Sequence, residues 1–330
     1  MAAIAENEEK VLSCHYLDFS SKLRTMIIDE MNSLDRCRFT RCSKLCDQEA
    51  KASKNFIFEL SFVCVRSYLE IKVIYGNVAS CGFSLKFKEK SGRKLKICEN
   101  LITRTLSEVE LDSLTNLLEH VIDEFNNRLE MFQNTIKKLS LMKLYYPERP
   151  EMFKTVSSSV QSLNNLEELM IMGDFDILQI FSKIRKPLKS LYLCRMDDGV
   201  LLENHEQVYQ VQQKLTLRCS NFDNSQFLRI SASIIKMRIG KLTEKDIISF
   251  IRSWQNGTIG KEIKRYSWDL GRSNFSSQKL LRLLRYQRFA YNKNFEGWIE
   301  IKHFNEHGKN ANLFVSKYHL RFYTEIPQGF

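Results

Sequence analysis

Two histidines near the carboxyl end of the chain have the spacing of a zinc-binding motif. His303, Glu306 and His307 form an H-x-x-E-H pattern, in which the imidazoles bind the metal and the glutamate activates a water molecule. That chemistry needs both histidines on one face of a helix. The residues before His303 instead alternate between apolar and polar types as in a β-strand, and Gly308 indicates a turn. We therefore expect an exposed hairpin tip at this position, and no bound metal.

Two other motifs also fall short of a site. Cys37, Cys42 and Cys46 offer thiolates to a zinc ion, but their spacing fits no zinc module that we recognise, and cysteine commonly packs as a small apolar residue. The loop Gly257–Lys261 has two residues between its glycines, where a phosphate-binding loop needs four. We therefore expect no cofactor, no nucleotide site and no catalytic residue, so the protein is not predicted to be an enzyme.

The whole chain has a net charge of +11, and basic side chains are concentrated in its last seventy residues. The segment from Lys279 to Arg288 places Arg282, Arg285 and Arg288 three residues apart between leucines, which predicts an amphipathic helix with one basic stripe. Such a stripe can hold an acidic or phosphorylated substrate, or it can be a solvated face. These three arginines are our candidate substrate-binding residues, and we do not expect nucleic acid as a partner.

The cysteines and the amino terminus indicate a cellular compartment. The nine cysteines are an odd number without a C-x-x-C pair, and the first ten residues are acidic where a signal peptide needs basic and then apolar residues. No apolar run approaches the roughly eighteen residues that cross a bilayer. We therefore expect free thiols, a location in the cytoplasm or nucleus rather than secretion, and no membrane association.

The first fifty residues predict a flexible acidic arm over residues 1–10 and a helical module over residues 11–52. Apolar residues recur every four positions, as one face of a helix requires, at Phe19, Leu23, Ile27 and Met31. Ser20 or Ser21 can cap this helix by accepting a hydrogen bond from an amide of its first turn.

The pattern then changes from helical to extended. Alternating aromatic and aliphatic residues predict a β-meander of about three or four strands over residues 53–104. Ser107 and Glu110 match a capping box, in which each side chain accepts a hydrogen bond from a backbone amide of the other. We therefore predict a connecting amphipathic helix over residues 105–135.

Residues 136–330 contain an irregular repeat of the form apolar-x-x-apolar-x-apolar, with central positions 22 to 30 residues apart. The copies centre on Leu139, Leu169, Leu191, Met237 and Tyr266, with a truncated copy at Leu215. This period is typical of leucine-rich-like arrays, in which each unit supplies a strand and a helix or turn. A plain α+β domain is the alternative.

Two parts of the chain resemble the expanded nematode family of F-box proteins. The segments Leu17–Met31, Leu34–Phe39 and Arg41–Lys44 are similar to an F-box, although Asp18 and Arg36 depart from its usual pattern. Residues 234–257 are similar to the F-box-associated domain of type 2, through a Leu-Thr-x-x-Asp-Ile entry and a Trp-x-x-Gly exit. Thr243 would cap the helix between them, and Gly257 would end it in the left-handed conformation.

The resemblance implies a non-enzymatic substrate-recognition subunit of a Skp–cullin–F-box ubiquitin ligase. The partners would be the Skp adaptor, through it a cullin, and a protein substrate that the sequence does not name. By the resemblance, the adaptor-binding residues would be Leu17, Phe19, Leu23, Ile27, Ile28, Met31, Leu34, Phe39 and Cys42. The alternative is a stand-alone protein-interaction scaffold that recruits no ligase.

Pattern and resemblance together predict the fold class α+β. The expected order is an N-terminal helical F-box-like module, a short β-meander, and an irregular leucine-rich-like α/β repeat array. The array would bind the substrate over residues 136–330 and would include the F-box-associated domain at about 210–270.

Overall fold

A computed structural model of the chain divides it into two compact units, Met1–Phe56 and Ile57–Phe330. The predicted acidic arm over residues 1–10 lies outside the described residues. The structure describes residues 16–31, 35, 39, 42–43, 45–46, 48–49, 57–65, 68–75, 82–90, 94–101, 104–112, 117–132, 135–143, 150–160, 163–173, 175–194, 206–218, 224–238, 242–259, 263–270, 275–286, 296–304 and 310–324.

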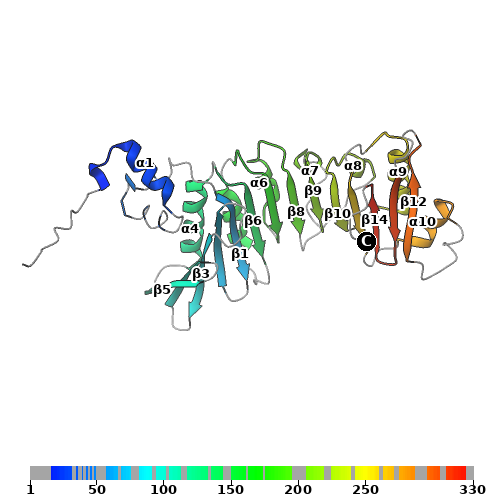
Figure 1. The fold of residues 1–330 in the computed structure, drawn as a ribbon. Helices are drawn as coiled ribbons and strands as arrows, with labels where there is room; N and C mark the ends of the chain where they lie inside the picture. The colour runs from blue at the N-terminus through cyan, green and yellow to red at the C-terminus, as the bar shows by residue number, and fades with distance from the viewer. Residues whose placement is uncertain are drawn as a thin grey trace, which may run out of the picture. The chain divides into compact units, whose positions relative to one another are not determined.

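The first unit begins, in its described part, with a 3-10 turn η1 at Tyr16–Asp18 and the helix α1 at Ser21–Glu30 (Figure 1). The Oγ of Ser20 accepts a hydrogen bond from the amide of Leu23 at 3.4 Å, which confirms the predicted serine cap. The fully buried residue of α1 is Ile28, next to the predicted apolar stripe rather than within it.

The second unit is built on one mixed sheet of fourteen strands, in the order β12-β13-β14-β11-β10-β9-β8-β7-β6-β1-β2-β3-β4-β5. The strands are β1 Ile57–Val65, β2 Tyr68–Tyr75, β3 Gly82–Lys90, β4 Lys94–Leu101, β5 Arg104–Asp112, β6 Lys138–Lys143, β7 Glu168–Met172, β8 Ser190–Cys194, β9 Lys214–Leu217, β10 Ile234–Arg238, β11 Arg265–Asp269, β12 Gly297–Lys302, β13 Asn310–Val315 and β14 His319–Tyr323.

Helices follow or connect most of these strands. The described helices of this unit are α4 Leu117–Phe132, α5 Pro150–Ser159, α6 Ile177–Phe181, α7 Glu206–Tyr209, α8 Asn224–Leu228, α9 Glu244–Gln255 and α10 Ser277–Leu283. Strands β6 to β11 are parallel, and one of the helices α5 to α9 lies between each consecutive pair (Figure 1). The helices supply the crossovers that parallel pairing needs.

The predicted fold class, α+β with separate parts, is wrong. Strand β1 pairs in parallel with β6, with Leu60 opposite Leu139, so the meander and the repeats form one sheet. Because the strands β6 to β11 are parallel and alternate with helices within one mixed sheet, the fold is α/β. The fold is therefore not built on the predicted N-terminal helical F-box-like module. The described residues of the first unit include one α-helix of regular length, α1. The strands β6 to β11 nevertheless lie at the repeat positions that the spacing indicated.

The predicted start of the connecting helix is also wrong. Ser107 and Glu110, which match a capping box, lie within strand β5. Backbone pairing of β5 with β4, for example Val109 opposite Ile97, outweighs the local capping signal. The helix α4 begins later, at Leu117.

The sheet has two different faces. One face is apolar and is covered by helices: the rings of Phe62 and Phe125 lie 5.4 Å apart, those of Phe250 and Tyr266 lie 4.9 Å apart, and all four side chains are buried. The opposite face, which we call the open face, carries the residues that alternate along each strand with those of the apolar face. Strand register places one row of them side by side, namely Lys72, Ser61, Ser140, Met170, Tyr192, Thr216, Lys236, Ser267, Arg321, Phe314 and Trp298.

The second unit confirms the predicted ends of one helix. Thr243 is the N-cap residue of α9, where its amide and its hydroxyl donate hydrogen bonds to the carboxylate of Asp246 at 2.7 Å and 2.8 Å, and Gly257 follows the helix with a φ of +73°. Three apolar residues of this helix, Ile247, Ile251 and Trp254, are buried.

Candidate functional site

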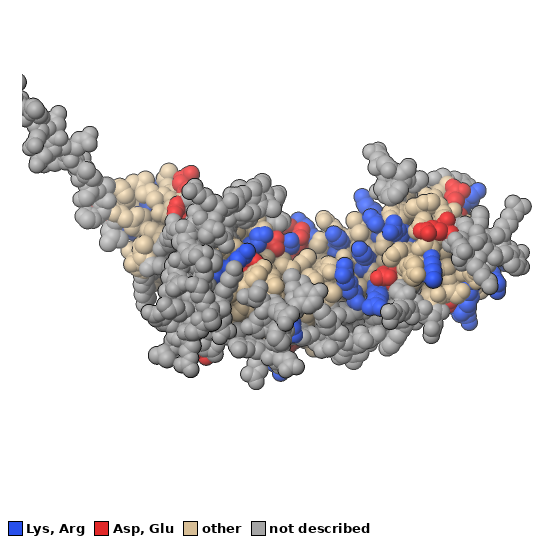
Figure 2. Space-filling view, turned by 90° about the horizontal axis from the view of Figure 1, so that it is seen from below, with Lys and Arg blue, Asp and Glu red and all other residues tan. Residues whose placement is uncertain are grey.

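A basic pocket of about 360 Å³ lies on the open face where β9, β10, β11 and β14 are neighbours. The charged residues that line it are Arg218, Lys236, Arg238, Arg265, Arg321 and one carboxylate, Asp269. Figure 2 shows lysines and arginines gathered on the right-hand half of that view, the half that holds β9 to β14 in Figure 1. We call this site the basic pocket.

The basic pocket takes cations from four adjacent strands, and two of these cations, Lys236 and Arg238, lie on β10. Lys236 lies on β10, Arg265 on β11 and Arg321 on β14, and Arg218 directly follows β9. Between these cations are hydroxyl groups, because register places Thr216 beside Lys236, and Ser267 between Lys236 and Arg321. Hydroxyls and cations therefore alternate across the strands.

Aromatic rings hold the arginines of the basic pocket. The guanidinium carbon of Arg265 lies 5.1 Å from the ring centre of Tyr323, and that of Arg321 lies 5.6 Å from Phe314. Arg218 lies 6.0 Å from the ring centre of Tyr192. Cation–π contacts of this kind restrict a long side chain without neutralising its charge.

Four of these cations lack an acidic partner. Arg218, Lys236, Arg265 and Arg321 form no ion pair with any residue that the structure describes. Arg265 does donate a hydrogen bond from Nε to the Oγ of Ser267 at 3.4 Å. Arg218, Lys236 and Arg265 are exposed and Arg321 is half-buried, so their donors are open to a ligand.

Farther along the open face, at β1 and β6, a carboxylate has its partners already in place. Glu59 accepts hydrogen bonds from Lys138 Nζ at 2.8 Å, from Ser61 at 2.7 Å and from Ser140 at 2.8 Å. Burial raises the pKa of Glu59, but the hydrogen bonds and the charge of Lys138 outweigh burial, and the pKa lies below its usual value. We call this arrangement the Glu59 cluster.

The chemistry that the basic pocket can perform is anion binding. Guanidinium and ammonium groups only donate hydrogen bonds, and planar guanidinium groups match carboxylates and phosphates. Burial raises the pKa of Tyr192, although Arg218 lowers it, so this phenol beside the pocket stays a neutral donor. Charge, hydroxyl donors and open access together define a binding surface.

The predicted substrate-binding arginines lie elsewhere. Arg282 is exposed on α10, but α10 ends at Leu283, and Arg285 follows it with a φ of +66°. The predicted single helix from Lys279 to Arg288 is therefore wrong. Arg285 lines a separate pocket of about 550 Å³ between α9 and β12, and Arg288 lies outside the described residues.

The sequence reasoning missed the basic pocket because its cations are far apart in the chain. Its signal was present, since the strands at the repeat positions of β10 and β11 alternate apolar residues with Lys236, Arg238 and Arg265. Parallel register then aligns these residues, which a search for local charge runs does not detect.

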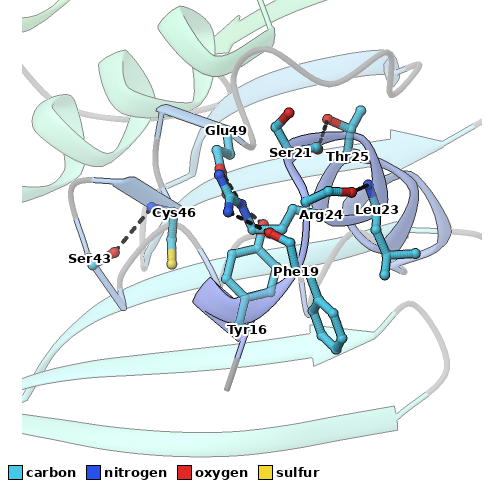
Figure 3. Close-up of polar contacts among 10 residues, drawn as sticks. Tyr16, Phe19, Ser21, Leu23, Arg24, Thr25, Ser43, Cys46 and Glu49 are labelled. Atoms are coloured by element: carbon cyan, nitrogen blue, oxygen red, sulfur yellow. Dashed lines mark hydrogen bonds and ion pairs between the residues drawn. The ribbon is translucent and has the colours of Figure 1, made fainter. Parts of the chain in front are cut away.

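A second candidate surface lies in the first unit, where a polar network fixes α1 (Figure 3). Glu49 accepts hydrogen bonds from the hydroxyl of Tyr16 at 2.5 Å and from Arg24 Nε at 2.7 Å. Arg24 also donates to the carbonyl oxygen of Phe19 at 2.8 Å. Burial and the hydrogen bond to Glu49 raise the pKa of Tyr16 well above its usual value, which keeps its hydroxyl a donor.

The predicted adaptor-binding residues differ in exposure. Leu23 is 41% exposed, Ile28 is buried, and Phe19, Ile27 and Met31 are half-buried. Phe39 packs edge-on against Tyr16 with ring centres 5.0 Å apart, and Cys42 is exposed. The side chain of Leu17 and all of Leu34 lie outside the described residues. The most exposed apolar residue of α1 is Met26, at 56%, which the sequence reasoning did not select.

The prediction of an exposed hairpin tip is wrong for the first histidine of the motif, His303. His303 directly follows β12, as the alternating pattern indicated, but it is buried against Trp254 with ring centres 5.1 Å apart. His307 lies outside the described residues. The described part of the chain contains no group of three His, Cys, Asp or Glu residues arranged to hold a metal ion.

Comparisons with known proteins give no family assignment. The chain matches no protein-family model, no curated protein and no solved structure. Within the described residues, no helix is both long enough and apolar enough to cross a membrane.

Proposed function

We propose that this chain is a non-catalytic substrate-recognition subunit of a Skp–cullin–F-box ubiquitin ligase. It binds the Skp adaptor, and through it a cullin, with α1, and it holds a protein substrate on the second unit. The observation that carries the proposal is the exposure of Leu23 and Met26 on α1, in the segment whose sequence resembles an F-box.

The exposed side chains suit an adaptor groove. Burying a leucine or methionine side chain that is otherwise exposed contributes about 1.5–3 kcal/mol, so a pair of them supports a specific helix-in-groove contact. Ile28 packs inside the unit, and Arg24 is tied to Glu49, so the helix is held while Leu23 and Met26 stay available.

The substrate side of the proposal needs no reactive group. A receptor raises the local concentration of its substrate near the ubiquitin carrier, which makes the later encounter effectively intramolecular. The open face offers a broad surface with cations and hydroxyls, which supports binding rather than bond cleavage.

The test is co-purification of the full chain with a Skp adaptor. The disruptive variant is Leu23→Asp with Met26→Asp, which places charges where apolar contacts are expected. The matched control is Ser21→Asp with Thr25→Asp, which adds the same charge to exposed positions of the same helix. Circular dichroism checks that both variants keep their fold.

We expect the wild type and the control to retain the adaptor, and the disruptive variant to weaken binding about tenfold or more, because burying charge in an apolar groove is costly. If the folded wild type does not bind the adaptor, or if both variants bind equally well, the ligase assignment is wrong. The chain would then be a stand-alone interaction scaffold.

A further inference from the structure

We propose that the basic pocket binds an acidic segment of a protein substrate, whose aspartate or glutamate side chains insert between its cations. The inference rests on the substrate-holding half of the proposed function and names the class of segment that is held. It does not depend on adaptor binding by α1.

Four of the five cations of the basic pocket are not neutralised by any residue that the structure describes. Arg218, Lys236, Arg265 and Arg321 come from four adjacent strands and make no ion pair with any described residue. Like charges held side by side repel one another, and a carboxylate placed between them removes this repulsion. Asp269 also lines the pocket and opposes an anion, but it is a single acid among five cations.

The Glu59 cluster provides an internal template for this binding. There a carboxylate on the open face accepts one bond from a lysine and one from each of two serines on neighbouring strands, all within 2.8 Å. The basic pocket contains the same types of hydrogen-bond donor, since Lys236 and Ser267 are adjacent in register, but none of its lining residues is a glutamate. A carboxylate from another chain can take the corresponding place.

The extent of the basic pocket fits an extended polypeptide. Adjacent strands are about 4.8 Å apart, so cations on four neighbouring strands span about 14 Å. An extended chain covers about 3.3–3.6 Å per residue, so four or five residues cross this distance. Charges spread over four strands match several carboxylates along a segment better than one concentrated phosphate.

The aromatic rings beside the basic pocket argue against nucleic acid. Single-stranded nucleic acids bind by stacking bases on exposed rings. Here the rings of Tyr192, Tyr323 and Phe314 each lie under an arginine, and Tyr323 is buried. These rings position cations and offer little surface for bases.

The test measures binding of a fluorescein-labelled oligoglutamate peptide to the full chain by fluorescence anisotropy, without adaptor, at low and high salt. The comparison probes are an oligoglutamine peptide, an oligoglutamine peptide that carries one phosphoserine, and a single-stranded oligouridine. The pocket variant is Arg218→Gln with Lys236→Gln. The matched control is Arg185→Gln with Lys186→Gln, which removes the same charge from exposed residues between α6 and β8.

We expect oligoglutamate to bind, oligoglutamine not to bind, and the pocket variant to weaken oligoglutamate binding about tenfold, because two charge-assisted contacts are lost. The control should change binding less than about twofold, since its charges act only at long range. If the pocket variant does not fold, Lys236→Gln alone should weaken binding about threefold.

Three results would overturn the inference: equal loss in the pocket variant and the control, tighter binding of the phosphoserine peptide than of oligoglutamate, or tighter binding of oligouridine. Failure of the Skp adaptor to bind leaves these outcomes unchanged, so the two proposals fail separately. A chain that binds oligoglutamate but no adaptor would be a scaffold with an acid-binding face.

Discussion

Two regions of the open face, the Glu59 cluster on β1 and β6 and the basic pocket on β9 to β14, use the same types of side chain for different purposes. We call them the first and the second end. At the Glu59 cluster a carboxylate, a lysine and two serine hydroxyls complete one another. At the basic pocket the cations and hydroxyls are present, but four of the cations have no acidic partner among the described residues. Charge at the first end therefore stabilises the fold, and charge at the second end is available for a ligand.

The same contrast holds around the first end. Glu167 bridges Lys137 and Lys189, each at 2.6 Å, directly before strands β6 and β8. These hydrogen bonds outweigh the effect of burial and lower the pKa of Glu167. Glu167 thus links the starts of β6 and β8 by ion pairs, whereas four cations on the open face of β9 to β14 have no such partner among the described residues.

The largest predicted effect tests whether the two ends share one core despite their different surfaces. Phe62 lies under the Glu59 cluster and Trp268 lies under the basic pocket, and both are almost fully buried. Phe62→Ala and Trp268→Ala should each lower the free energy of unfolding by about 3–5 kcal/mol. Urea denaturation followed by circular dichroism measures this.

One cooperative transition that shifts in both variants would show that the ends fold together. If each substitution instead shifted only one of two separate transitions, the sheet would consist of two folding units. The Glu59 cluster and the basic pocket would then belong to separate domains.

The next largest effect concerns backbone turns at the two ends. Gly173 has a φ of +109°, and a Cβ there would lie 2.6 Å from the Cβ of Lys143, so Gly173→Ala should destabilise the protein by about 2–3 kcal/mol. Gly257 also has a positive φ, but its nearest neighbour, His303, would be 3.6 Å away. Gly257→Ala should cost about 1 kcal/mol. Equal losses in thermal denaturation would contradict this difference.

A third prediction addresses the carboxylate that only the first end possesses. Glu59→Gln leaves Lys138 without its partner and should lower stability by about 1–3 kcal/mol at neutral pH. The pKa of Glu59 is lower in the folded state than its unfolded value of about 4.3, so the ionised form stabilises the fold. That contribution is complete above the unfolded pKa and is lost as the pH falls through the folded pKa.

The measurement is urea denaturation of the wild type and Glu59→Gln at several pH values. The difference in stability should be constant above about pH 5.5 and should shrink as the pH falls below the unfolded pKa. Glu300→Gln is the control, because Glu300 is exposed on β12 and bonds Asn310 rather than a cation. A difference that grows on acidification would show that Glu59 is not stabilised as a carboxylate.

The sequence predicts the repeats better than it predicts how the strands pair into one sheet. An irregular repeat of apolar residues indicated the strands β6 to β11, and Thr243 with Gly257 indicated the ends of α9, because these signals are local. The parallel pairing of β1 with β6 joins residues about eighty positions apart, such as Glu59 and Ser140, and no local pattern specifies it. The fold class was missed for this reason.

The candidate site follows the same rule. The arginines at Arg282 and Arg285 were selected because they are close in sequence, yet the helix ends between them. The cations of the basic pocket are brought together only by register between strands. A pattern search over equivalent strand positions would have found Lys236 and Arg265, whereas a search for charge runs finds the wrong surface.

The smallest predicted effect is the most direct test of the comparison. Lys138 and Lys236 both lie on the open face, but Lys138 bonds Glu59 and Lys236 forms no ion pair with a described residue. Lys138→Gln should lower the free energy of unfolding by about 1 kcal/mol, since it leaves a half-buried carboxylate without its cation. Lys236→Gln should change stability by less than about 0.5 kcal/mol, as expected for a surface position without structural contacts.

Urea denaturation of the two variants at low salt gives the clearest difference, because salt screens the repulsion that Lys236→Gln relieves. A stability loss in Lys236→Gln as large as that in Lys138→Gln would mean that Lys236 has a structural role, and the pocket would then resemble the Glu59 cluster. No loss in Lys236→Gln together with weaker oligoglutamate binding would separate the two ends by function, since one lysine would serve the fold and the other the ligand.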